Sequence, residues 1–322
     1  MLCLYCPVYS RCPKLSDQEA GMTSSAITTV LLPAALAVIM FGLGLSLSRS
    51  DFTRVLSYPR AVVVALACQV LLLPAICFGL VVALDLAPEL AVGMMLLAAA
   101  PGGTTANLFS HLAHGDVALN VSLTAINSLL AVFTLPLVVN WSIARFLGDG
   151  TGISLQFGKM LQVFAIVLVP VALGMLVHAK AAAFAARMRA PVRLLSVVFL
   201  VGTIGVAIFQ ERANIGGYLR EVGIAALVFS VLSLTIGYFA PRLFRVNRRQ
   251  SVASAMEIGI HNSTLATTIA LSPALLNSGE IAVPGAVYGV LMFFTAGAFG
   301  LFVARKARTE GLDATVVAPS PG

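Results

Sequence analysis

Apolar runs of about twenty residues follow one another along nearly the whole chain, and these runs constrain its fold more than any other feature. Hydrophobic residues make up 59% of the 322 residues and charged residues only 10%, whereas a soluble domain carries about 25%. One water-soluble core cannot bury so much apolar surface. The runs are too long and too uniform for barrel strands, so the sequence predicts an all-α polytopic membrane protein.

We predict nine transmembrane helices within a membrane domain at 22–308. Residues 1–21 are interpreted as an N-terminal tail or the product of an upstream start site, because "MTSSAITTVLLP" is a plausible chain start at Met22. The polar residues 309–322 are interpreted as a disordered C-terminal tail. The predicted spans are 26–48, 60–84, 88–113, 116–142, 157–178, 190–210, 221–241, 248–275 and 281–304.

Basic residues gather in alternate loops between these spans, which predicts the orientation of the chain. The side that they favour is cytoplasmic, so the N-terminus is predicted outside and the C-terminus inside a cell inner membrane. Their dispersal over short loops also argues against nucleic acid as a partner, and the lipid bilayer is the expected surrounding. The side rich in Lys and Arg carries Arg49, Arg54, Arg60, Lys180, Arg187, Arg189, Arg193, Arg242, Arg245, Arg248, Arg249, Arg305, Lys306 and Arg308.

Helix-breaking and polar residues interrupt two of the predicted spans. The third span contains Pro-Gly-Gly at 101–103, and the eighth contains Gly259 between Glu257 and the run His-Asn-Ser-Thr at 261–264. The two spans are five apart and therefore cross the membrane in opposite directions. This pattern predicts inverted repeats with two crossing broken helices around a binding site. The alternative is that Pro and Gly merely kink two ordinary membrane helices.

Glu257 is the only acidic residue that the predicted spans place near the middle of the membrane. A charge at this depth costs about 2.5–3.5 kcal/mol. It is protonated, paired with His261, or bound to a cation. The side chains around the breaks offer oxygen, and neither break contains a cysteine, which disfavours soft metals. The sequence therefore predicts sodium as the bound cation.

Four polar residues in the fourth span are spaced so that they share one helix face: Asn120, Thr124, Asn127 and Ser128. This face can line the site beside the buried carboxylate. For Asn127 and Ser128 we favour a simpler role, hydrogen bonding between helices. Gln69, a lone amide in the second span, is open to either interpretation.

Three stretches resemble the bile acid:sodium symporter family: "FGLGLSLSRSDFTRV" at 41–55, "APGGTTANLFSHLAHGDVALNVSLT" at 100–124 and "EIGIHNSTLA" at 257–266. The resemblance implies a core domain with two crossing broken helices, a panel domain that rocks against it, and symport of an organic anion with two sodium ions. It assigns one sodium site to Asn107, Asn120, Thr124 and Glu257, and the other to Gln69, Glu257, the carbonyls of Ile258 and Ile260, and residue 261.

His261 departs from the family pattern, in which this position carries glutamine. A neutral imidazole is a poor ligand for a hard cation, and a protonated one repels sodium. Our hypothesis is that the second sodium site is weakened or lost, and that a protonated His261 can replace that ion's charge. The alternative is that His261 donates a hydrogen bond to Glu257.

The substrate is expected to be a small carboxylate or a bile-acid-like anion. The predicted mid-membrane segments contain no Lys or Arg, so the starts of the half-helices and four polar residues would hold the anion: Thr104, Thr105, Asn262 and Ser263. The alternatives are a sodium/proton or other ion exchanger, which usually needs a second titrating carboxylate, and a membrane enzyme. An enzyme is the least favoured of these hypotheses, because its only candidate pair, His261 and Ser263, is two residues apart and the side chains diverge on a helix.

Overall fold

The computed structural model describes residues 37–38, 40–42, 44–45, 55–103, 105–148, 157–188, 190–192, 194–195, 198, 215–272 and 275–309. Most of the first and sixth predicted spans lies outside these residues. So do the segments at 1–21 and 310–322, and Thr104.

Four continuous helices in the described part of the chain are long and apolar enough to cross a membrane. They coincide with the second, fourth, seventh and ninth predicted spans. The first consists of α4 (Pro59–Ala67), the π-helical stretch η3 (Cys68–Leu72) and α5 (Leu73–Ala83), preceded by the short 3-10 helix η2 (Val55–Ser57). The others are α8 (Val117–Phe146), α11 (Ile215–Leu243) and α14 (Gly279–Thr309), and a further helix, α9 (Phe157–Lys180), falls at the fifth predicted span.

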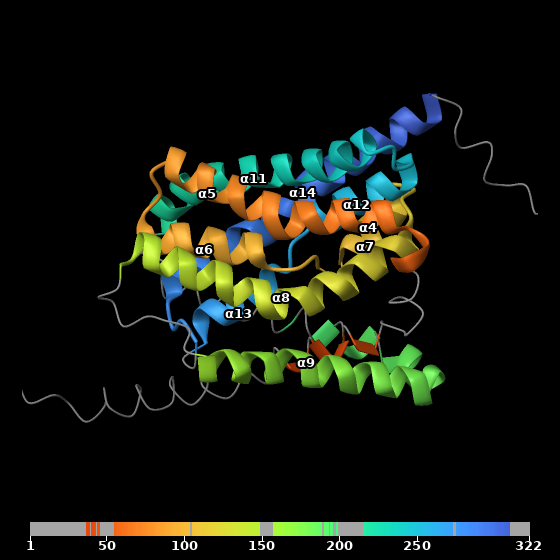
Figure 1. Cartoon of the computed structure of the whole chain (residues 1–322), viewed down its shortest axis with the longest axis horizontal. Helices are drawn as coiled ribbons and strands as arrows, with labels where there is room; N and C mark the ends of the chain where they lie inside the picture. The colour runs from red at the N-terminus through yellow and green to blue at the C-terminus, as the bar shows by residue number, and fades with distance from the viewer. Residues whose placement is uncertain are drawn as a thin grey trace, which may run out of the picture.

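Two pairs of half-helices occupy the third and eighth predicted spans. The first pair is α6 (Pro88–Ala99) and α7 (Thr105–Leu112), and the second is α12 (Arg248–Gly259) and α13 (Ser263–Leu271). The predicted interruptions at 101–103 and at Gly259 are therefore confirmed. Figure 1 shows that α6 and α12 enter the bundle from opposite ends and that both stop near its middle.

The helices around the two breaks begin and end at corresponding places. Pro88 and Arg248 each open a helix of 12 residues that stops at a break. The turns before these helices contain Asp85 (φ 49°) and Arg245 (φ 60°), and both residues are in the left-handed region. Left-handed residues also precede the long helices that follow the breaks, His114 before α8 and Asn277 before α14.

The half-helices α6 and α12 form the centre of the bundle. Every residue from Leu90 to Ala99 is buried, and so is every residue from Gln250 to Gly259. The long helices α8, α11 and α14 pack around them. The polar groups at the breaks are thus surrounded by protein, which is the condition under which irregular backbone is tolerated at membrane depth.

Apart from Glu257, the charged residues of the described helices lie towards the two ends of the bundle, and most of the acidic ones lie at the opposite end from most of the arginines. The acidic Asp85, Glu89 and Glu280 lie at the end where α6 and α14 begin. The other end, where α4 and α12 begin, carries most of the described arginines: Arg60, Arg242, Arg245, Arg248, Arg249 and Arg305.

Close packing between α11 and α12 yields a first prediction. A Cβ at Gly237 would lie 2.7 Å from the Cα of Ala255, whereas a Cβ at Gly223, on the same helix, would meet nothing within 4 Å. We expect Gly237→Ala to destabilise the protein by about 1–3 kcal/mol through overpacking. Gly223→Ala should leave stability unchanged or raise it, because alanine favours helix. Thermal unfolding of the two variants in detergent checks this, and equal melting temperatures would contradict the described packing.

Candidate functional site

The two breaks meet each other through their backbones. Gly102 and His261 form an antiparallel bridge. The N–H of Gly103 donates to the carbonyl of Ile260 at 2.7 Å, and the N–H of Asn262 donates to the carbonyl of Pro101 at 2.8 Å. Each interruption thus satisfies backbone groups that the other has lost from its helix, and the crossing point is fixed by hydrogen bonds.

Side chains satisfy further carbonyls at the ends of α6 and α12. Gln69 donates through Nε2 to the carbonyl of Ala100 at 3.1 Å, and the ring Nδ1 of His261 lies 3.3 Å from the same oxygen. The hydroxyl of Tyr288, on α14, donates to the carbonyl of Gly259 at 2.8 Å. The open ends of both half-helices are therefore tied to neighbouring helices.

Glu257 is completely buried, two residues before α12 ends. One carboxylate oxygen accepts from the hydroxyl of Thr124 at 2.5 Å, and the other accepts from Nδ2 of Asn127 at 3.0 Å. The backbone of Gly102 also hydrogen-bonds the carboxylate. Within the described residues no Lys, Arg or His forms an ion pair with it. All its contacts are neutral donors, so a buried negative charge here lacks a counter-charge from the protein.

Gly102 allows the first break to reach the carboxylate. A Cβ at this position would lie 2.2 Å from one oxygen of Glu257. Such an overlap is impossible without moving backbone or carboxylate. Glycine at 102 is therefore required by close approach.

One face of α8 supplies the side chains around Glu257, as the spacing predicts. Asn120 donates to the carbonyl of Ala253, one turn before Glu257 on α12, at 2.7 Å. Thr124 and Asn127 contact the carboxylate itself. Asn127 hydrogen-bonds between helices, as predicted, and its acceptor is the carboxylate of Glu257. Its position three residues after Thr124 places it on the same face of the helix, so the spacing could have predicted this contact.

The role predicted for Ser128 was wrong. It was expected to hydrogen-bond between helices, but its hydroxyl donates to the carbonyl of Thr124 in its own helix at 2.7 Å. A serine in a helix readily bonds back to the residue four positions earlier, so no neighbouring helix is needed to satisfy it.

Three buried amide oxygens near the crossing accept no hydrogen bond from the described part of the protein: Oε1 of Gln69, Oδ1 of Asn120 and Oδ1 of Asn127. The nitrogen of each amide has an acceptor, which supports the assignment of these atoms as oxygens. Buried polar atoms normally have partners, so these three oxygens are available to a bound water molecule or cation.

Gln69 lies in the π-helical stretch Cys68–Leu72. Pro74 explains the irregularity, because its ring has no N–H and crowds the carbonyl four residues earlier. A π-turn rotates the side chains that precede it relative to a regular helix, and such turns occur often at functional sites. Here the stretch holds Gln69 against the first break.

His261 is buried in an aromatic cluster. Its ring stacks on Phe229 with centroids 5.4 Å apart and meets Tyr288 edge-on, also at 5.4 Å. Its Nδ1 contacts the carbonyl of Ala100, and Nε2 has no hydrogen-bond partner among the residues described. His261 therefore does not hydrogen-bond to Glu257 in this structure, so the alternative role predicted for it is not seen.

The remaining predicted residues lie around the crossing with different surroundings. Ile258 and Ile260 are buried at the end of α12, and the carbonyl of Ile260 pairs with Gly103. Asn107 lies in α7 and Thr105 begins it; both are half-buried.

Asn262 and Ser263 differ in where their side chains lie. Asn262 caps α13, with Oδ1 accepting from the N–H of Leu265 at 3.0 Å. Ser263 packs against α14, since a Cβ at Gly289 would lie 2.7 Å from its hydroxyl.

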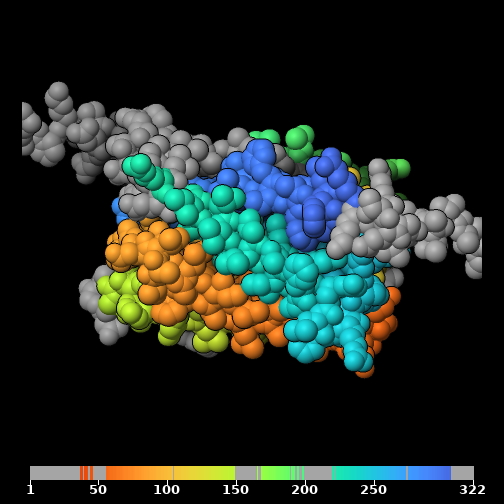
Figure 2. Space-filling view, turned by 90° about the horizontal axis from the view of Figure 1, so that it is seen from above, coloured from red at the N-terminus to blue at the C-terminus, as the bar shows by residue number. Residues whose placement is uncertain are grey.

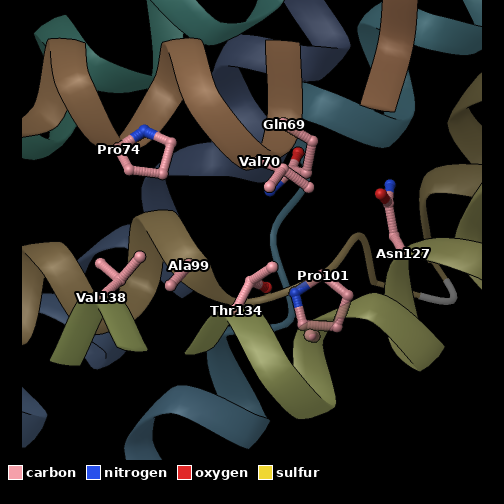
Figure 3. A pocket seen from close by; sticks show the side chains of 9 residues that line it. Gln69, Val70, Pro74, Ala99, Pro101, Asn127, Thr134 and Val138 are labelled. Carbon is pink, nitrogen blue, oxygen red and sulfur yellow. The ribbon is translucent and has the colours of Figure 1, made fainter. Parts of the chain in front are cut away.

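Two small cavities flank Pro101 on the side of α8. One, of about 10 Å³, lies between Gln69, Asn127 and Thr134 (Figure 3). The other, of about 30 Å³, is bordered by Ser128 and Asn262. A cavity of 10–15 Å³ holds about one water molecule, so neither admits an organic anion in this arrangement.

The Sodium Bile acid symporter family matches residues 33–217. The chain is 29% identical to the uncharacterized sodium-dependent transporter YocS of Bacillus subtilis over 281 residues, covering 85% of this chain and 83% of the relative. It is 25% identical to the human ileal sodium/bile acid cotransporter over 291 residues, covering 88% and 81%. It is 27% identical to the probable chloroplastic sodium/metabolite cotransporter BASS1 of Arabidopsis thaliana over 238 residues, covering 73% of this chain and 57% of that protein.

The family match covers more than half of the chain, and the relatives extend it past the second break. Apolar helices, a buried site at two broken helices and these matches agree on a multi-pass membrane protein that transports rather than catalyses. The chain belongs to the sodium bile acid symporter family, a family of sodium-dependent transporters.

Proposed function

We propose that the protein is a sodium-coupled symporter of a small organic anion. The observation that carries the proposal is Glu257, a buried carboxylate at the crossing of two broken helices that is surrounded by neutral donors. A cation that enters with the substrate supplies the missing counter-charge. The relatives named as sodium-dependent transporters and sodium/metabolite cotransporters support sodium as that cation.

The residues around Glu257 fit a hard cation. The carboxylate, the hydroxyl of Thr124 and the amide oxygens of Asn120 and Asn127 are oxygen ligands that belong to one region of α8 and α12. Sodium, like other hard ions, prefers oxygen. We assign the coupling ion to these groups, together with Asn107 from α7.

We propose that this chain couples transport to one sodium ion. The second site expected from the family would use Gln69, the carbonyls of Ile258 and Ile260, and residue 261. Here Gln69 and His261 both point a nitrogen at the carbonyl of Ala100, and the His261 ring is held by Phe229 and Tyr288. A nitrogen ligand in an aromatic cluster is a poor substitute for an amide oxygen.

The substrate is proposed to be a monocarboxylate-like anion that binds beside the crossing. The helices α7 and α13 begin there, and the starts of helices favour negative charge. We place the anion at the starts of α7 and α13, near Thr105, Asn262 and Ser263; Thr104, the fourth predicted contact, lies outside the described residues. Because the cavities beside Pro101 are too small for it, the helices must separate for binding, as alternating access requires.

We further propose that α4 to α8 and α11 to α14 are inverted repeats. The equal half-helices α6 and α12, their entry from opposite ends, and the matching left-handed residues Asp85 and Arg245 support this. The arginine-rich end of the bundle is proposed to face the cytoplasm of a bacterial cell, which puts the C-terminus inside its inner membrane.

Glu257→Gln tests the function. The amide keeps the size of the side chain but removes the charge that sodium is proposed to neutralise. Sodium at 100 times its Kd should stabilise the wild-type protein by about 2.7 kcal/mol and the variant not at all. Uptake of small carboxylates into vesicles should lose its dependence on a sodium gradient.

Thr235→Val is the matched control for loss of a polar group, because the Thr235 hydroxyl bonds within α11 and is exposed. It should retain both the stabilisation and the uptake. Undiminished sodium-driven accumulation by Glu257→Gln would refute the assignment.

His261→Gln tests the sodium stoichiometry. The wild-type protein should show sodium activation with a Hill coefficient near one. The variant restores an amide that can offer oxygen, so its coefficient should rise towards two, with a steeper dependence of uptake on sodium. Initial rates of uptake over a range of sodium concentrations measure both. A coefficient near two in the wild-type protein would show that His261 does not weaken the second site.

A further inference from the structure

A large groove on the outer surface of the bundle is separate from the transport site. It lies between α4 and the end of α11, which run side by side on one face of the molecule (Figure 2). Its volume is about 1030 Å³. The walls are apolar and include Val63, Ala67 and Leu72 from one side and Phe244 from the other. In a membrane such a groove is filled by apolar chains.

One end of the groove is basic. Arg60 and Arg245 both line it, both are exposed, and neither forms an ion pair with any residue that the structure describes. No acidic residue lines the groove. Arg60 is in the first turn of α4, whose start lacks a side-chain cap and has no acidic residue in that turn. The positive end of the α4 dipole adds to the potential of the two guanidinium groups.

We propose that this groove binds an anionic diacyl phospholipid, with its phosphate between Arg60 and Arg245 and an acyl chain along the groove towards Leu72. Arginine binds phosphate oxygens in pairs, and basic pockets between membrane helices are suited to anionic headgroups. Both arginines lie at the end of the bundle where α4 and α12 begin and α11 ends. In a membrane, the ends of spanning helices lie near the lipid headgroups.

The shape of the groove favours a lipid over a free anion or a partner protein. A free phosphate would use the arginines but leave the apolar walls uncovered. A partner helix would cover the apolar walls, but it would pair with the two arginines only if it carried acidic residues. A phospholipid matches both features at once, since its charge and its apolar chain are joined in the order that the groove requires.

The proposal is tested by titrating delipidated protein with dioleoylphosphatidylglycerol or dioleoylphosphatidylcholine and counting bound lipids by native mass spectrometry. The wild-type protein should bind the anionic lipid at least tenfold more tightly. Arg60→Gln and Arg245→Gln should each weaken that lipid about fivefold, the effect of about 1 kcal/mol per basic residue. The double variant should bind both lipids equally.

Arg242→Gln is the matched control, because Arg242 is an exposed arginine at the same end that does not line the groove. It should bind both lipids as the wild-type protein does.

Ala67→Trp fills the groove from an exposed position and should weaken the binding of both lipids. Glycerol 3-phosphate should not compete at millimolar concentration, which separates a lipid from a free phosphate. Equal binding of the two lipids by the wild-type protein, or an equal loss in Arg242→Gln, would overturn the proposal. None of these outcomes depends on sodium or transport.

Discussion

The structure depends on the backbone pairing of two broken helices at the centre of a membrane bundle. An interrupted helix at this depth exposes N–H and carbonyl groups that lipid cannot satisfy. Here each break supplies partners for the other, through Gly103 with Ile260 and Asn262 with Pro101. The carbonyls that remain take side chains from Gln69 and Tyr288. Two defects that would each be costly alone become one stable crossing, and the ends of four half-helices are brought to a single place.

The crossing explains where the carboxylate lies. Glu257 is close enough to the end of α12 to reach the backbone at Gly102, and α8 passes on its other side with Thr124 and Asn127. Three neutral donors orient the carboxylate without cancelling its charge. A full cationic partner such as arginine would fix the site permanently. The mobile ion that we propose would leave the same site able to change its charge, which is what coupling to a gradient requires.

The sequence indicates the crossing and its carboxylate because both depend on residues with few alternative uses. Pro101 and the glycines after it disfavour a continuous helix, and an acidic residue in an apolar span is costly to bury unless a partner compensates its charge. Asn127 was harder to assign, since an asparagine in a membrane helix serves equally well between helices and at a site. The π-helical stretch at Cys68–Leu72 was not predicted, because its apolar residues suit a regular helix and only the nearby Pro74 distinguishes it. The contacts of His261 depend on Phe229 and Tyr288, which are distant in sequence.

The two breaks differ in origin, although their geometry is paired. The first is encoded locally, by a proline and two glycines within three residues. The second has Gly259 but no proline, and Ile260 to Asn262 have no intrinsic need to leave a helix. What holds the second break open is largely tertiary: the bridge from Gly102 to His261 and the hydroxyl of Tyr288 on Gly259. The one local contribution is the cap that Asn262 gives to α13. The first break therefore supplies backbone partners that keep the second one open, and the part of the site that contains Glu257 takes its shape partly from residues far earlier in the chain.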